Sequence, residues 1–83
     1  MCSYITEKTA IYGSAKGGDE WTSVTAAHVY FDHPYHAALD HALSIDFMSS
    51  DQRKVAVEMS ADSARALVAS ILAALESGEH AHK

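Results

Sequence analysis

The chain of 83 residues shows two kinds of hydrophobic periodicity, one after the other. Up to residue 59, apolar and polar residues alternate with a period of two, which is typical of half-buried β-strands. From Ser60 onward the apolar residues recur every three or four positions, as in an amphipathic helix. This order predicts a single α+β domain over residues 1–83. We expect a four-stranded, mainly antiparallel sheet (ββββα order) with one C-terminal helix packed on one face.

The strands are predicted at residues 3–12, 21–32, 43–48 and 54–59. Alternation assigns one set of side chains to the core, namely Ala27, Val29, Phe31, Leu43, Ile45, Phe47, Val55, Val57 and Met59. Lys54 and Glu58 are expected to face water. The glycine-rich segment 13–20 is predicted to be a loop and residues 49–52 a polar turn.

The C-terminal helix has the clearest pattern in the chain. Its apolar stripe consists of Ala64, Leu67, Val68, Ile71, Leu72 and Leu75. Ser60 is a suitable N-cap, Asp62 complements the positive end of the helix dipole, and Gly78 is expected to end the helix. Residues 79–83 lack periodicity, and we expect them to fray. Pro34 suits a first helical turn, so a second, short helix is predicted over residues 34–42.

A domain of this size buries a thin core, and Cys2 is the single cysteine, so no disulfide within the chain can support it. A partner subunit would supply the missing burial. The sheet face opposite the helix is predicted to carry Tyr4, Tyr12, His28 and Tyr30, which would suit a homodimer contact or the wall of a pocket.

Charge and hydropathy exclude several classes of protein. The formal net charge is −5 and the six Lys and Arg residues are scattered, which argues against nucleic-acid binding. No apolar run reaches the length of about 20 residues that spans a membrane. The N-terminal residues lack the basic start and apolar run of a signal peptide, so we expect a cytoplasmic protein.

Four of the six histidines lie between His28 and His41. Imidazole nitrogen is a common ligand of zinc and other transition metals. We predict a metal site, most simply for Zn²⁺, formed by the turn histidines His33, His36 and His41, with further candidate ligands in His28, Cys2 and Asp40. If Pro34 begins a helix, His36 and Asp40 share one of its faces.

Other interpretations of these residues stay open. The histidine spacing matches neither a zinc finger nor a His-Glu-x-x-His helix, so the histidines could be solvated or could cap neighbouring elements. Cys2 could be a small buried hydrophobe. A metal-dependent enzyme would also need an acid or base, for which Asp32 and Asp40 are the nearest candidates. The segment 13–18 lacks the Walker order, which favours a hairpin loop over a phosphate site.

Three stretches carry a resemblance to a known family. They are the opening Met-Cys-Ser-Tyr-Ile-Thr-Glu-Lys, the run from Val29 to Phe47 that contains Asp-His-Pro-Tyr-His-Ala, and Ser-Ala-Arg-Ala-Leu in the helix. Over nearly its whole length the chain resembles a family of small bacterial proteins known only as a domain of unknown function. The resemblance implies no activity, so the candidate residues rest on their chemistry.

Overall fold

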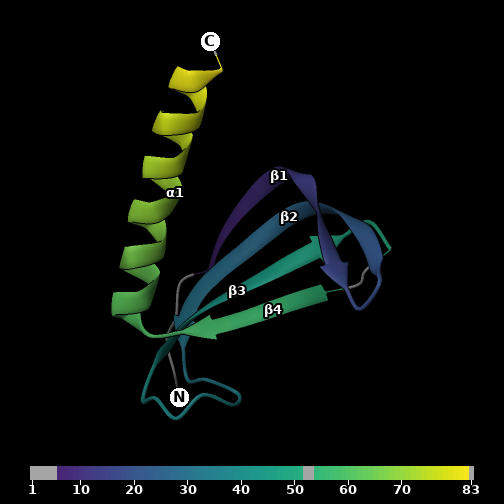
Figure 1. Cartoon of the computed structure of the whole chain (residues 1–83). Coiled ribbons are helices and arrows are strands. Elements are labelled where there is room, and N and C mark those ends of the chain that lie inside the picture. Colours follow the sequence, from purple (N-terminus) through teal and green to yellow (C-terminus); the bar gives the residue numbers. More distant parts are fainter. Residues whose placement is uncertain (1–5, 52–53, 83) are drawn as a thin grey trace.

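A computed structural model describes residues 6–51 and 54–82 of the chain (Figure 1). Four strands form one antiparallel sheet in the order β1-β2-β3-β4, and a single helix, α1, follows them. The elements are β1 Thr6–Gly17, β2 Glu20–Asp32, β3 Ala42–Ser49, β4 Lys54–Met59 and α1 Ala61–Ala81. The predicted α+β class and ββββα order are confirmed.

The β1–β2 hairpin is longer than the sequence pattern indicates. The loop predicted at residues 13–20 is wrong, because β1 continues to Gly17, which pairs with Glu20 across a two-residue turn. Gly18 has a φ of 64°, the left-handed conformation that such tight hairpin turns require. A register shift between Ala10 and Gly13 marks a β-bulge, which strengthens the local twist.

The two faces of the sheet differ in chemistry, as the alternation predicts. The face that we call the polar face carries Thr6, His28, Tyr30, Asp32, Ser44, Asp46 and Glu58. The opposite face, which we call the apolar face, carries Val29, Phe31, Leu43, Ile45, Phe47, Val55, Val57 and Met59. The predicted core positions therefore share one side of the sheet. Tyr4 lies outside the described residues, and Tyr12 sits fully exposed at the bulge.

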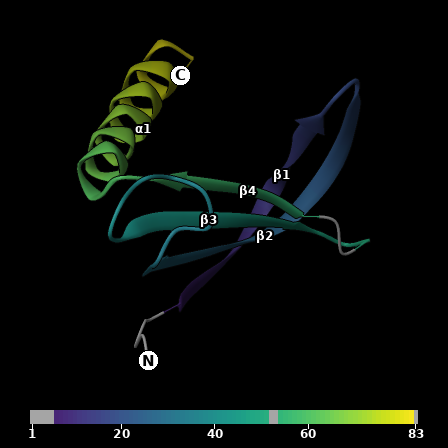
Figure 2. The same ribbon diagram turned by 90° about the horizontal axis from the view of Figure 1, so that it is seen from below.

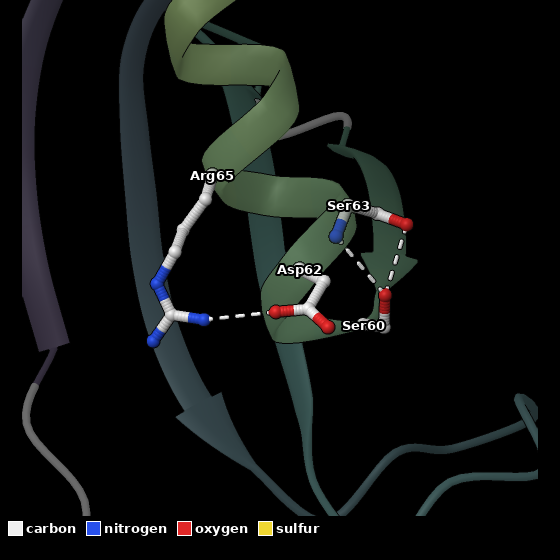
Figure 3. Close-up of polar contacts among 4 residues, drawn as sticks. All are labelled: Ser60, Asp62, Ser63 and Arg65. Atoms are coloured by element: carbon white, nitrogen blue, oxygen red, sulfur yellow. Dashed lines mark hydrogen bonds and ion pairs between the residues drawn. The ribbon is translucent and has the colours of Figure 1, made fainter.

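The helix begins as predicted, with Ser60 as its N-cap (Figure 3). The Ser60 hydroxyl oxygen accepts a hydrogen bond from the Ser63 amide at 3.1 Å. Arg65 pairs with Asp62 at 3.2 Å, but both side chains are largely exposed, so this pair adds little stability.

The predicted end at Gly78 is wrong, because α1 continues to Ala81 and so includes the first residues of the tail that was expected to fray. The Gly78 carbonyl oxygen accepts a hydrogen bond from the His82 amide at 3.0 Å, which extends the hydrogen-bond ladder of the helix. A glycine inside a helix lowers the stability of the helix by only about 1 kcal/mol relative to alanine, so the helix can continue through Gly78. The helix is not long and apolar enough to span a membrane.

The helix lies on the apolar face and contacts β3, and its far half extends beyond the sheet (Figures 1 and 2). Its first half and the sheet enclose a groove of about 280 Å³, lined by Val29, Leu43, Ile45, Met59, Ala64, Arg65, Leu67, Val68 and Ile71. No residue of the helix is buried. Within the described ranges, the buried apolar residues are Val24, Ala27 and Ala42. The core of this chain is therefore small.

Between β2 and β3, residues 33–41 form an irregular loop, so the predicted short helix over 34–42 is wrong. The loop has other partners for its polar backbone groups. The Asp32 carboxylate accepts a hydrogen bond from the His33 amide at 2.8 Å. The amides of Tyr35, His36 and Ala37 donate hydrogen bonds to the side chain of Glu58 on β4. These contacts replace the hydrogen bonds that a helical turn would have made.

Candidate functional site

Glu58 holds the histidine-rich loop against the polar face. Its carboxylate accepts hydrogen bonds from three consecutive amides, those of Tyr35, His36 and Ala37. The His36 and Ala37 amides lie 3.1 and 3.2 Å from Oε1. The bond from the Tyr35 amide is the largest cause that lowers the pKa of Glu58, and the other two amides and the charge of His36 act in the same direction, while desolvation opposes them. The carboxylate is thus stabilised in its ionised form.

Two adjoining pockets open on this face, and they share Tyr30, Tyr35 and Asp46. The first, which we call the Glu58 pocket, has a volume of about 380 Å³ and is also lined by His36, Ala37, Ser44, Ala56, Val57 and Glu58. The second, which we call the His28 pocket, has a volume of about 300 Å³ and is also lined by Thr6, His28, Asp32 and His33. The polar face therefore combines concave surface with titratable groups.

The His28 pocket brings two imidazoles and two carboxylates to one place. His28 lies on β2 directly across from Asp46 of β3 in the strand register. Asp32 ends the same strand, and His33 follows it as the first residue of the loop. The Tyr30 hydroxyl donates a long hydrogen bond of 3.5 Å to Asp46 Oδ2, which links two residues that line both pockets.

The ring of His33 is oriented by the far end of the loop. Its Nδ1 lies 3.1 Å from the carbonyl oxygen of Asp40. A carbonyl oxygen accepts hydrogen bonds only, so Nδ1 carries the proton and Nε2 retains the lone pair of the neutral ring. The ring also stacks on His41 at a centroid distance of 4.9 Å, and His41 stacks on Phe31 at 5.6 Å.

The structure separates the predicted ligands into different environments. His36 faces the Glu58 pocket, whereas His28 and His33 line the His28 pocket. Asp40 contributes its main-chain carbonyl to His33, and the helical face that it was predicted to share with His36 does not form. Cys2 lies outside the described residues. Within residues 6–51 and 54–82, no three histidine, cysteine or acidic side chains form a ready metal cluster.

Two polar residues of the site were missed by sequence reasoning. Glu58 was expected to face water, but it anchors the loop from a position 21 to 23 residues further along the chain. Asp46 lines both pockets. The one available signal was their outward position in the strand pattern, which placed both on the same face as His28 and Tyr30.

Comparison with known proteins gives a family but no activity. Neither a curated protein nor a solved structure matches the chain. The profile of a family of unknown function matches residues 1–83, which confirms the resemblance noted in the sequence. With its sheet, its loop and its C-terminal helix all inside that match, the chain belongs to the family of unknown function DUF6295.

Proposed function

We propose that this protein is a small metal-binding domain that holds a transition-metal ion, most simply Zn²⁺, in the His28 pocket. One observation carries the proposal: His28, His33, Asp32 and Asp46 line the same pocket. Nitrogen and carboxylate oxygen are the donors that zinc takes from proteins besides thiolate. The donor set is thus two histidines and two carboxylates rather than the three histidines of the loop.

The hydrogen bond of His33 supports this assignment. Histidines that bind metals usually donate their other ring N–H to a carbonyl or carboxylate, which fixes the tautomer and leaves the second nitrogen for the metal. His33 has this arrangement, because Nδ1 donates to the Asp40 carbonyl and Nε2 is left as the nitrogen that would bind the metal. Asp40 therefore takes part through its main chain, as a residue that orients a ligand.

Binding would draw the donors together. The four side chains line a common pocket, but no three of them yet lie close enough together to bind one ion. His33 is exposed and lies in the same irregular loop as Asp40, so the loop can shift towards His28 while the hydrogen bond between His33 and Asp40 is kept. The metal would then tie the loop to β2, and a small domain would gain stability from the ion.

The test uses untagged protein, elemental analysis and a zinc titration followed by calorimetry. The wild type is expected to bind one Zn²⁺ per chain, and His28→Ala and His33→Ala are expected to abolish binding. His36→Ala is the matched control, because it removes an imidazole from the same loop that faces the other pocket. Equal loss of zinc from all three variants, or no stoichiometric binding by the wild type, would contradict the proposal.

A further inference from the structure

We infer that the apolar face is an interface between two copies of this chain, with α1 of each copy lying in the groove of the other. The inference is independent of the metal site, which is on the opposite face of the sheet. It rests on the exposed side chains of the apolar face, on the pattern of the helix, and on the area that the two together present.

The first step is the amount of apolar surface left uncovered. Eight large apolar side chains on this side of the sheet are 39 to 62% exposed, namely Phe31, Val55, Val57, Leu67, Val68, Ile71, Leu72 and Leu75. Together they present roughly 700 Å², close to the roughly 800 Å² that each partner contributes to a standard interface. Contiguous apolar patches of this size are uncommon on monomers.

The second step is the shape of the surface. The groove of about 280 Å³ runs between the sheet and the first half of α1, and its lining is apolar apart from Arg65. The helix itself is about 31 Å long for its 21 residues, and Leu72 and Leu75 lie beyond the part that lines the groove. Figure 1 shows this far half extending beyond the strands. Each chain thus offers both a groove and a projecting apolar helix.

The third step is the match between two such helices. The stripe Ala61, Ala64, Val68, Ile71, Leu75 and Gly78 alternates spacings of three and four, the repeat by which helices pack along their length. An antiparallel second copy centred between residues 69 and 70 sets Val68 against Ile71 of that copy. It also sets Ala64 against Leu75, so that small residues meet large ones.

The charged residues beside the stripe also favour an antiparallel arrangement of the two helices. Arg65 and Glu76 lie three turns apart on one flank of α1. An antiparallel copy brings Arg65 of one chain near Glu76 of the other, because residues on the same flank face each other across an antiparallel pair. In a parallel pair each flank faces the opposite flank of the partner, so this contact between opposite charges would be lost. A twofold arrangement repeats the contact twice, so the face is complementary to itself. For this reason a second copy, rather than an unrelated helix, fits the groove.

The experiment measures the mass of the full chain in solution by light scattering and sedimentation over a range of micromolar concentrations. The wild type is expected at twice the chain mass. The variant Leu72→Glu/Leu75→Glu is expected to be a monomer, because it places four carboxylates in the paired interface. Ala73→Glu on the opposite side of the same helix is the matched control and is expected to remain a dimer.

A second measurement stays informative if the double glutamate variant fails to fold. In a Cys2→Ser background, Ala64→Cys/Leu75→Cys is expected to form a disulfide-linked dimer on mild oxidation, and Ala66→Cys/Ala73→Cys is not. A wild type that is monomeric throughout would overturn the inference and leave the face to a different partner. A dimer that survives Leu72→Glu/Leu75→Glu, with no cross-link between positions 64 and 75, would place the contact elsewhere and would equally overturn it.

Discussion

The two faces of the sheet are covered in different ways. On the polar face, the chain folds its own loop 33–41 over the strands and fastens it with Glu58. On the apolar face, α1 covers β3 with its first turns and then leaves the sheet. The polar face is organised by hydrogen bonds within one chain, whereas the apolar face keeps enough exposed surface for a second one.

The difference follows from the physics of each kind of surface. A few directed hydrogen bonds can order a short loop, because each one fixes a backbone group at a defined point. Apolar burial is undirected and scales with area, and one helix attached at one end removes little area from water. A chain of 83 residues can therefore complete a polar site alone more easily than an apolar core.

The largest expected effect comes from placing a charge on the apolar face. Ile45→Asp is predicted to lower the free energy of unfolding by about 3 kcal/mol or more, because it removes a groove residue and puts a carboxylate among apolar side chains. Urea denaturation followed by circular dichroism measures this. Thr9→Asp on the exposed surface of β1 is the control and should stay within about 0.5 kcal/mol of the wild type. Equal stability of the two variants would show that the groove is no more sensitive to a charge than the exposed surface of β1.

A smaller loss of stability is expected from a substitution where the loop covers the polar face. Ala42 is fully buried at the point where the loop returns to the sheet. Ala42→Leu is predicted to cost about 1 to 3 kcal/mol through overpacking. Ala56→Leu, at an exposed alanine of the same face, is predicted to change stability by less than about 0.5 kcal/mol. If the two leucines cost the same in urea denaturation, the loop does not cover the sheet tightly at Ala42.

The smallest expected effect is a pH-dependent change in the loop that Glu58 holds. The pKa of Glu58 is lowered in the fold from its ordinary value of 4.5, chiefly by the Tyr35 amide. The carboxylate therefore anchors the loop fully above about pH 4.5, and the anchor is lost as the pH falls through the lower folded value. Nuclear magnetic resonance should show the amide shifts of Tyr35, His36 and Ala37 moving together in that range.

Substitution of the carboxylate checks the assignment of this titration. Glu58→Gln should remove the common transition and give shifts typical of a looser loop at every pH. Glu7→Gln, an exposed glutamate on β1, should leave the loop shifts unchanged. A transition that persists in Glu58→Gln would show that another group holds the loop.

The parts of the fold that the sequence predicted are those that depend on local pattern. The alternation in residues 43–48 and 54–59 and the stripe of the helix were sufficient to place β3, β4 and α1 and to assign their faces. The errors occurred where tertiary contacts outweigh local signals. Glycines at 13–18 indicated a loop but belong to a hairpin that pairs up to Gly17, and Pro34 indicated a helix whose amides instead bind a distant glutamate.

The candidate site was predicted only in part, because the rest of it also depends on tertiary contacts. The density of histidines located the right segment, and the strand period put His28 on the face that holds the pockets. The grouping of His33 with His28, and of His36 with Glu58, depends on how the loop crosses the sheet. That path is set by a residue on β4, and no spacing within the loop contains the information.

The end of β4 has a consequence for how this sequence can change. Consecutive residues there serve different parts of the molecule: Val57 belongs to the apolar face, Glu58 holds the loop, Met59 lines the groove and Ser60 caps the helix. Because side chains alternate between faces, inserting or deleting one residue would exchange these roles all at once. Relatives that preserve this architecture should therefore keep the number of residues between the loop anchor and the helix cap constant.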